Sequence, residues 1–213
     1  GYIFDDFSTA AARTEPNIVR NLGFDVVVNT VVPAKTAAVV YNAAGLEFDE
    51  SRFRNAWDLS ASVPLIGVSG WQALNQGGDA IGLWADLDSY TRDLANVDED
   101  DDLEVASFAN AVTSIDYREG FPGTGAGASM EWNDSGSFAT GDNWYVNDEF
   151  TASVSVATSL DDLPINNAAD IGNPGFVVGN VDAASSLVIT EIMYNPASDE
   201  PDWEWIEVFN GSN

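Results

Sequence analysis

Short apolar runs separated by turn-forming residues extend along this 213-residue chain, and they constrain its fold more than any other feature. The runs are rich in Val, Ile, Tyr, Phe and Trp, and Asn, Asp, Gly, Pro and Ser lie between them, as is typical of a β-sandwich. The predicted strands cover residues 2–4, 25–32, 37–41, 80–84, 111–117, 129–132, 187–194 and 203–209. A chain of this length can bury the core of one large sandwich or of two small domains.

One stretch has a helical pattern. Phe53, Ala56 and Trp57 recur at i, i+3 and i+4, and Asp49 is placed to cap the start of a helix. We therefore expect a short helix within residues 48–57, packed on the edge of a sheet. Two further stretches are linker-like. Residues 86–104 are dense in carboxylates and predict a solvated loop, and residues 153–186 predict an extended or lightly structured connection.

The charge balance excludes one class of partner. The chain carries 35 acidic residues against seven basic ones, for a formal net charge of −28. Such a surface repels phosphate backbones, so we expect no nucleic-acid partner. No apolar run is long enough to span a bilayer, and the sequence does not open on a signal-peptide pattern. We therefore expect an extracellular or cell-surface protein, present here as a mature piece of something larger.

The absence of His and Cys restricts the chemistry. Without His there is no serine triad and no common transition-metal ligand, and without Cys there are no disulfides. Glu204 and Glu207 lie three residues apart in a predicted strand, where they point to opposite faces and make a poor glycosidase pair. The seven Trp are expected mainly in the core, with a sugar-stacking surface as the alternative. The sequence thus predicts a protein that is not an enzyme.

Calcium is the one cofactor that the carboxylates suggest. Three acidic residues alternate as at the opening of a calcium loop, and the candidate ligands are Asp98, Asp100 and Asp102. However, Leu103 stands where an EF-hand needs Gly, and Ala109 stands where it needs a bidentate Glu. An irregular calcium loop in residues 86–104, or one at Asp5 and Asp6, therefore competes with a solvated acidic loop.

Two motifs near the C-terminal end carry a resemblance to a known family. Residues 187–196 read LVITEIMYNP, and residues 202–210 read DWEWIEVFN. This pair resembles the opening of bacterial lamin-tail domains, which have a strand ending in Glu-Ile-Met-x-Asn-Pro, a polar loop, then Glu-Trp-Ile-Glu and Asn. The resemblance implies an immunoglobulin-like β-sandwich with one short helix, that is, an all-β fold of the lamin-tail type.

The rest of that family pattern lies earlier in the chain. Residues 1–6 (GYIFDD) resemble the third strand of the family, and residues 37–41 with Phe53 and Trp57 resemble the strand and helix that follow. Residues 74–84 (LNQGGDAIGLW) are similar to its Leu-Asn-Asn-x-Gly-Asp-x-Ile-x-Leu hairpin. Residues 116–131 resemble its closing strands, and Asn143-Trp144 its end. The likeness covers most of residues 1–146 and 187–210.

The motif order is therefore rotated, with the opening strands last. Residues 1–152 are expected to form a sandwich lacking its opening strands, residues 153–186 a linker, and residues 187–213 the opening strands. Three explanations stay open: a window cut from a tandem array, a circular permutant whose hairpin completes its own sheet, or a polymer subunit whose hairpin completes the next copy.

The C-terminal hairpin is too apolar to stand alone in water, because isolated hairpins are marginally stable. It must lie in a sheet, of its own chain or of a neighbour. The residues expected to fill that sheet are Ile189, Ile192, Tyr194, Trp205, Ile206, Val208 and Phe209. Donation to a neighbour would be head-to-tail and would give a homo-oligomer or polymer.

These patterns predict a structural subunit of an extracellular filament or surface array, assembled by strand complementation between copies. The alternative is a non-catalytic carbohydrate-binding or adhesion module of a large secreted protein, because bacterial lamin-tail domains often accompany enzymes in such proteins.

Overall fold

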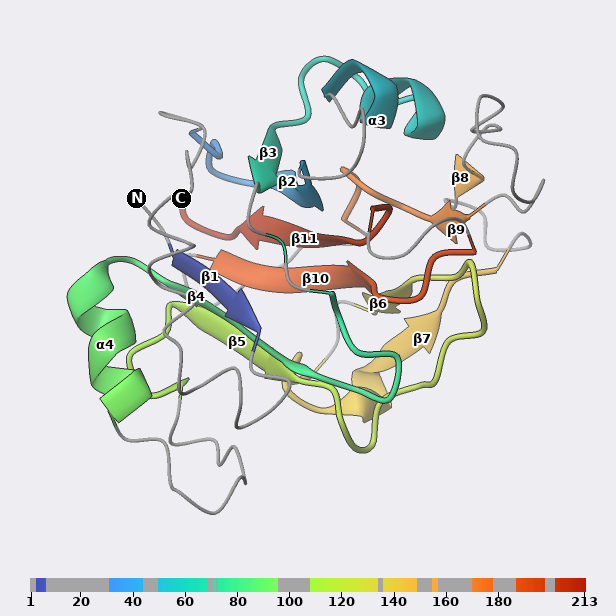
Figure 1. The fold of residues 1–213 in the computed structure, drawn as a ribbon. Helices are drawn as coiled ribbons and strands as arrows, with labels where there is room; N and C mark the ends of the chain where they lie inside the picture. Colours follow the sequence, from blue (N-terminus) through green and yellow to red (C-terminus); the bar gives the residue numbers. More distant parts are fainter. Residues whose placement is uncertain are drawn as a thin grey trace.

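The structure is a computed structural model, in which β-strands arranged in sheets form most of the regular structure (Figure 1). It describes residues 3–6, 31–43, 50–68, 71, 73–95, 108–133, 136–148, 155–156, 170–177, 187–197 and 202–213. The described residues include two short α-helices, α3 (Glu50–Trp57) and α4 (Leu87–Ala95). None of the described helices is long and apolar enough to cross a membrane. The all-β class expected from the strand pattern is confirmed.

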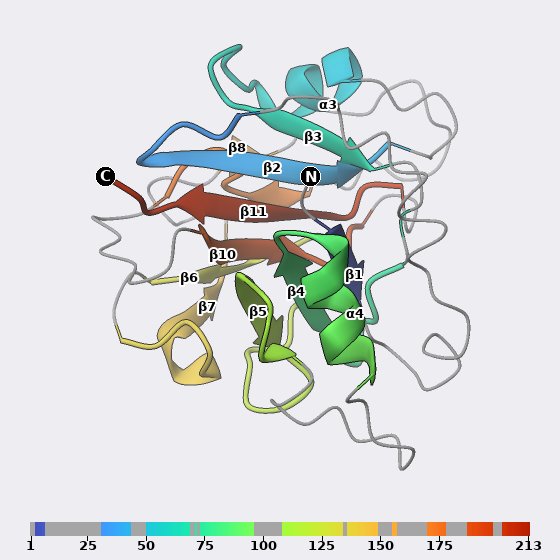
Figure 2. The same cartoon turned by 90° about the vertical axis from the view of Figure 1, so that its left-hand side faces the viewer.

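A six-stranded sheet forms the centre of the molecule, in the order β3-β2-β11-β10-β6-β7. Its strands are β3 (Leu65–Val68), β2 (Thr36–Asn42), β11 (Trp205–Asn210), β10 (Leu187–Met193), β6 (Met130–Trp132) and β7 (Trp144–Val146). Figure 2 shows β3, β2, β11 and β10 side by side. All neighbours are antiparallel except β2 and β3, which run parallel and are separated in sequence by α3.

Two smaller sheets accompany it. The three-stranded sheet has the order β1-β4-β5, with β1 (Ile3–Asp6), β4 (Ala80–Trp84) and β5 (Thr113–Asp116), all antiparallel. The two-stranded sheet pairs β8 (Ser155–Val156) with β9 (Ile171–Gly172). The stretch 153–186, predicted as a connection, therefore contains both of these short strands.

The hairpin β10–β11 occupies the two central positions of the six-stranded sheet of its own chain. Strand β11 pairs with β2 over six residues, from Trp205↔Tyr41 to Asn210↔Thr36. On the other side, β10 pairs with β6 over only two, Glu191↔Glu131 and Ile192↔Met130. Within the structure, one chain therefore supplies both the hairpin and the strands on either side of it.

The main core lies between the six-stranded and three-stranded sheets. The three-stranded sheet contributes Phe4, Ile81, Leu83 and Ile115. The opposite sheet contributes buried residues from all six of its strands, among them Ala38, Val40, Val68, Met130, Trp144, Val188, Ile189, Ile192, Ile206, Val208 and Phe209. Tyr194, directly after β10, stacks on Tyr117 with ring centroids 5.2 Å apart.

A second core lies on the opposite face of the six-stranded sheet, beneath α3. Phe53 and Trp57 of this helix are buried with Tyr41, Trp203 and Trp205. The helix predicted within residues 48–57 is therefore confirmed, together with its buried face. All seven Trp are at most 8% exposed, which confirms their interpretation as core residues and argues against an exposed tryptophan surface for sugars.

The acidic stretch 86–104 differs from its prediction as a loop. Its first part is α4, capped by Asp86, whose Oδ1 accepts a hydrogen bond of 2.8 Å from the Ser89 amide. Tyr90 packs edge-on against Trp84 at 4.8 Å between ring centroids. Asp93 is fully buried and accepts hydrogen bonds from Trp84 Nε1 and from the backbone and side-chain amides of Asn110. The helix forms because its apolar and buried side faces β4, while Asp88 and Arg92 remain exposed.

Candidate functional site

Three buried glutamates form a row across the centre of the six-stranded sheet. Glu191 of β10 is directly opposite Glu131 of β6 on one side and Glu207 of β11 on the other. All three are at most 2% exposed. Like charges directly opposite one another destabilise a sheet, and buried carboxylates are costly without compensation. We refer to Glu131, Glu191 and Glu207 as the glutamate row.

A β-bulge sets the register of this row. Ile189 pairs with Val208, but Glu191 pairs with Glu207, so Thr190 is an extra residue in β10. A bulge re-aims the side chains that follow it. The buried Thr190 hydroxyl donates a hydrogen bond of 2.6 Å to Glu207 Oε1. The other oxygen, Glu207 Oε2, accepts one of 2.7 Å from the Gly175 amide.

Glu191 has its hydrogen bonds concentrated on one oxygen. Its Oε1 accepts from the Ser129 hydroxyl at 2.5 Å, from Asn147 Nδ2 at 2.9 Å and from the Asn173 amide at 2.8 Å. Asn147 Nδ2 also lies 3.1 Å from Glu131 Oε2, which links the two carboxylates. Among the described residues, the buried atoms Glu191 Oε2 and Asn147 Oδ1 have no hydrogen-bond partner.

Residues 170–177 cover the row, and we call them the cover segment. The segment is fixed to the chain before β6, because the Ile171 amide donates to Gly127 O and the Ser129 amide donates to Ile171 O. Gly172 packs closely over the row: a Cβ at this position would lie 3.2 Å from Glu191 Oε1. Gly175 has a φ of +84°, which favours glycine, and its Cα faces the methyl groups of Val63.

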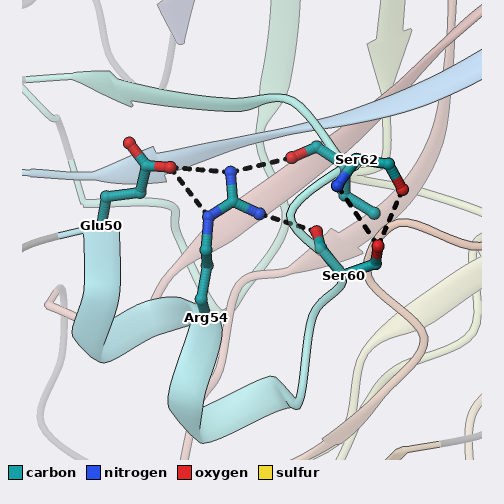
Figure 3. Close-up of polar contacts among 5 residues, drawn as sticks. Glu50, Arg54, Ser60 and Ser62 are labelled. Atoms are coloured by element: carbon teal, nitrogen blue, oxygen red, sulfur yellow. Dashed lines mark hydrogen bonds and ion pairs between the residues drawn. The ribbon is translucent and has the colours of Figure 1, made fainter.

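Arg54 of α3 holds the loop that flanks the cover segment (Figure 3). Its guanidinium donates to Ser60 O at 2.8 Å and to Val63 O at 2.9 Å, and it forms an ion pair with Glu50 one turn earlier. Ser60 and Ser62 are joined by a hydroxyl hydrogen bond of 2.8 Å. These contacts position Val63 against Gly175, so the helix contributes indirectly to the closure over the glutamates.

Burial makes Glu191 and Glu207 resist ionisation. Desolvation, followed by the charges of Glu131 and Glu207, raises the pKa of Glu191 well above 4.5. Desolvation also raises the pKa of Glu207 to about 8, against the opposing hydrogen bonds from Thr190 and Gly175. Tyr145, opposite Glu131 on β7, has its pKa raised by burial and by the Glu131 charge. The arrangement thus favours protonated carboxyl groups over three charges.

Other buried carboxylates act as acceptors that fix loops. Glu204 Oε2 accepts hydrogen bonds from Trp71 Nε1 at 2.8 Å and from the Leu74 amide at 2.7 Å. Glu204, which lies one residue before β11, and Glu207, within it, contact different segments. Asp170 Oδ1 accepts from the Ala197 amide at 2.6 Å and so ties the cover segment to the loop after β10.

The residues predicted to fill the sheet are all buried. Ile189, Ile192, Tyr194, Ile206, Val208 and Phe209 belong to the main core, and Trp205 belongs to the core beneath α3. The candidate calcium ligands Asp98, Asp100 and Asp102 lie outside the described residues, and the side chains of Asp5 and Asp6 are likewise not described. In the described part of the chain, no group of three or more Asp or Glu is arranged to hold a metal ion.

The glutamate row was not predicted from the sequence. The available signal was a Glu inside each of three apolar strands, at Glu131, Glu191 and Glu207. Glutamate within an apolar run is rarely buried unless paired, so these positions stand out. Their alignment requires the strand order and the bulge, which a local pattern does not contain.

Comparisons with known proteins give no relative. The chain matches no family model, and no curated protein or solved structure resembles it significantly.

Proposed function

We propose that this chain is an immunoglobulin-like β-sandwich of the lamin-tail type and a non-catalytic structural subunit of an extracellular filament or surface array. The lamin-tail motifs at residues 187–196 and 202–210 support the family, because they coincide with the adjacent strands β10 and β11. Full burial of the row supports a non-catalytic role, since Glu191 and Glu207 have no exposed surface with which to meet a substrate.

The burial of the hairpin carries the proposal. The hairpin fills the centre of the six-stranded sheet and contributes residues to both cores. Without it, β2 and β6 would each present an unpaired edge, and such edges recruit other strands. The same hydrogen bonds and core contacts form whether the hairpin comes from its own chain or from a second copy, so copies can associate by exchanging hairpins.

The energy of these contacts makes a sheet that lacks the hairpin unstable. Each large apolar side chain stabilises the fold by about 1.5–3 kcal/mol on burial. The seven predicted residues therefore contribute roughly 10–20 kcal/mol before ordering entropy is subtracted. Because closed and exchanged forms share these contacts, the local concentration of hairpins decides between them.

A cysteine pair distinguishes the two forms. Thr36 and Asn210 are Cα partners across the β2–β11 seam, and both are partly exposed. The natural sequence contains no Cys, so cysteines introduced at these two positions can pair only with each other. Partners at this spacing of about 4.5–5.5 Å are within reach of a disulfide. After oxidation of T36C/N210C in the assembled material, we expect covalent ladders on a denaturing gel, with the N210C single variant giving at most dimers. Closed, cross-linked monomers at every protein concentration would overturn the exchange.

A second candidate is favoured by the pairing of the hairpin within its own chain. A circular permutant that completes its own sheet would act as a monomeric adhesion or carbohydrate-binding module. Electron microscopy separates the candidates: regular filaments support the structural subunit, and dispersed monomers with affinity for glycans support the module.

A further inference from the structure

The glutamate row lies where a change in charge would act on the hairpin. Its three members belong to three adjacent strands, and two of those strands form the hairpin. The β6–β10 seam has only two Cα pairs, one of which is Glu131↔Glu191, whereas the β10–β11 and β11–β2 seams have six each. We infer that the row is a proton-controlled lock, which holds the hairpin in the sheet while Glu191 and Glu207 carry protons and weakens the β6–β10 seam when they lose them.

The surroundings of the row supply carboxylates and dipoles. The charges that raise the pKa of Glu191 are those of Glu131 and Glu207. The charge that raises the pKa of Glu207 is that of Glu131. From β7 the facing group is the Tyr145 phenol. The cover segment contributes the amides of Asn173 and Gly175, while its Asp170 carboxylate accepts from Ala197. Charging the row therefore sets like charges against one another in a dry site.

The basic side chains of the described residues make contacts elsewhere. Those contacts are Lys35 with Gly211 O, Arg52 over the Trp203 ring, Arg54 with Glu50, Arg92 with Asp88 O and Arg118 with Asp116. Arg52 and Arg54 belong to α3, which packs on the same face as the row. In the described part of the chain, these five basic side chains therefore have partners outside the row.

The unpartnered atoms support protonation independently. Glu191 Oε2 is a fully buried carboxylate oxygen with no hydrogen-bond partner among the described residues, although its Oε1 accepts three. Within the same network, Asn147 Oδ1 is a buried acceptor that no described donor satisfies. A carboxylic O–H on Oε2 would remove the charge from the unsolvated oxygen and leave the three accepted hydrogen bonds in place.

The direction of the pH effect follows from proton binding. A folded state that keeps protons above the ordinary glutamate pKa of 4.5 binds more protons than the unfolded chain. Its stability is therefore complete below that value and is lost as the pH rises toward the folded pKa, about 8 for Glu207. For each proton released on opening, the equilibrium constant for opening of the β6–β10 seam rises by up to about tenfold per pH unit. This inference concerns a single chain and does not rest on exchange between copies.

Amide hydrogen exchange on the full chain tests the lock. Wild-type protein is compared at about pH 5 and about pH 9, after correction for intrinsic exchange rates, together with E191Q and E119Q. Glu119 is exposed and lies outside the row, so E119Q makes the same Glu-to-Gln substitution and serves as a matched control. We expect protection in β6 and β10 to fall by tenfold or more at the higher pH in wild type and E119Q, with little change in β1, β4 and β5. In E191Q the pH response should shrink.

Three results would overturn the inference. One is an unchanged pH response in E191Q, which would place the effect in the general repulsion of the acidic surface. Another is an equal loss of protection in both sheets. The third is full recovery of protection at pH 9 on adding millimolar calcium, which would show that the row binds a cation. If E191Q does not fold, E131Q takes its place. The strand-by-strand pattern of protection in wild type then still distinguishes an effect of the glutamate row from general repulsion of the acidic surface.

Discussion

Gly172 lies directly over the glutamate row, and a single added methyl group there tests whether the cover is closely packed. A Cβ at this position would lie 3.0 Å from Ser129 Oγ, 3.0 Å from Trp205 Cζ2 and 3.2 Å from Glu191 Oε1. Its φ is not in the left-handed region, so Gly172→Ala introduces crowding without backbone strain. All three neighbours are fully buried, which leaves them little room to move.

The expected magnitude is the difference between two effects. Overpacking a buried site by one methyl group costs about 1–3 kcal/mol. Replacing Gly by Ala reduces the entropy of the unfolded chain and thereby stabilises the folded state by about 0.4–1 kcal/mol. We therefore expect Gly172→Ala to lower the free energy of unfolding by about 1–2 kcal/mol, with a fall in melting temperature of roughly 2–8 °C for a chain of this size.

Urea denaturation measures this change, provided that the slope with denaturant stays constant. Gly125→Ala is the matched control, because a Cβ at Gly125 has no atom within 4 Å and the same entropic effect applies. The control should be neutral or slightly stabilised. Equal or greater stability of Gly172→Ala than of Gly125→Ala would show that the cover segment is loose, and the steric reasoning would fail.

Three further predictions concern the hairpin, the loop beside the cover and calcium. A chain ending at Ser186 should aggregate or melt early, and adding a separate 187–213 peptide should restore it; a well-behaved truncated monomer with unchanged melting would contradict this. Arg54→Ala should lower the free energy of unfolding by about 1–2 kcal/mol in thermal melts, because it removes bonds to Ser60 O and Val63 O, whereas the exposed Arg92→Ala should change it by less than about 0.5 kcal/mol. If residues 86–104 bind calcium, EDTA should lower the melting temperature and loosen filaments, and no change in either would dispose of that site.

The helix α3 and the strands β1, β2, β4, β5, β6, β10 and β11 could be predicted because their signals are local, whereas β3, β7, β8 and β9 were not predicted. Phe53 and Trp57 have helical spacing and are both buried, and the apolar run at residues 187–194 became β10 almost unchanged. The helix α4 was missed because its carboxylate density resembles a solvated loop. Two of those carboxylates have structural roles: Asp86 caps the helix, and Asp93 is a buried acceptor for Trp84 and Asn110.

The candidate site could not be derived from alternation alone. Strict alternation along β10 places Ile189 and Glu191 on one face, but Ile189 lies in the main core while Glu191 lies under the cover segment. The extra residue Thr190 separates them, and a bulge is a property of two paired strands. The partner Glu131 is 60 positions earlier in the chain, so its alignment with Glu191 depends on tertiary pairing.

The bulge at Thr190 also makes insertion of the hairpin selective for its own sequence. Only one alignment places Glu191 among its donors Ser129, Asn147 and Asn173, with Ile192 in the apolar core. A shift of one residue would turn Glu191 into that core and Ile192 toward the polar network. An unpaired carboxyl group in the core costs several kcal/mol. A strand from an unrelated protein, or a hairpin inserted in another register, would therefore bind less stably. The sheet binds a hairpin well only in the register that places Glu191 among its hydrogen-bond donors.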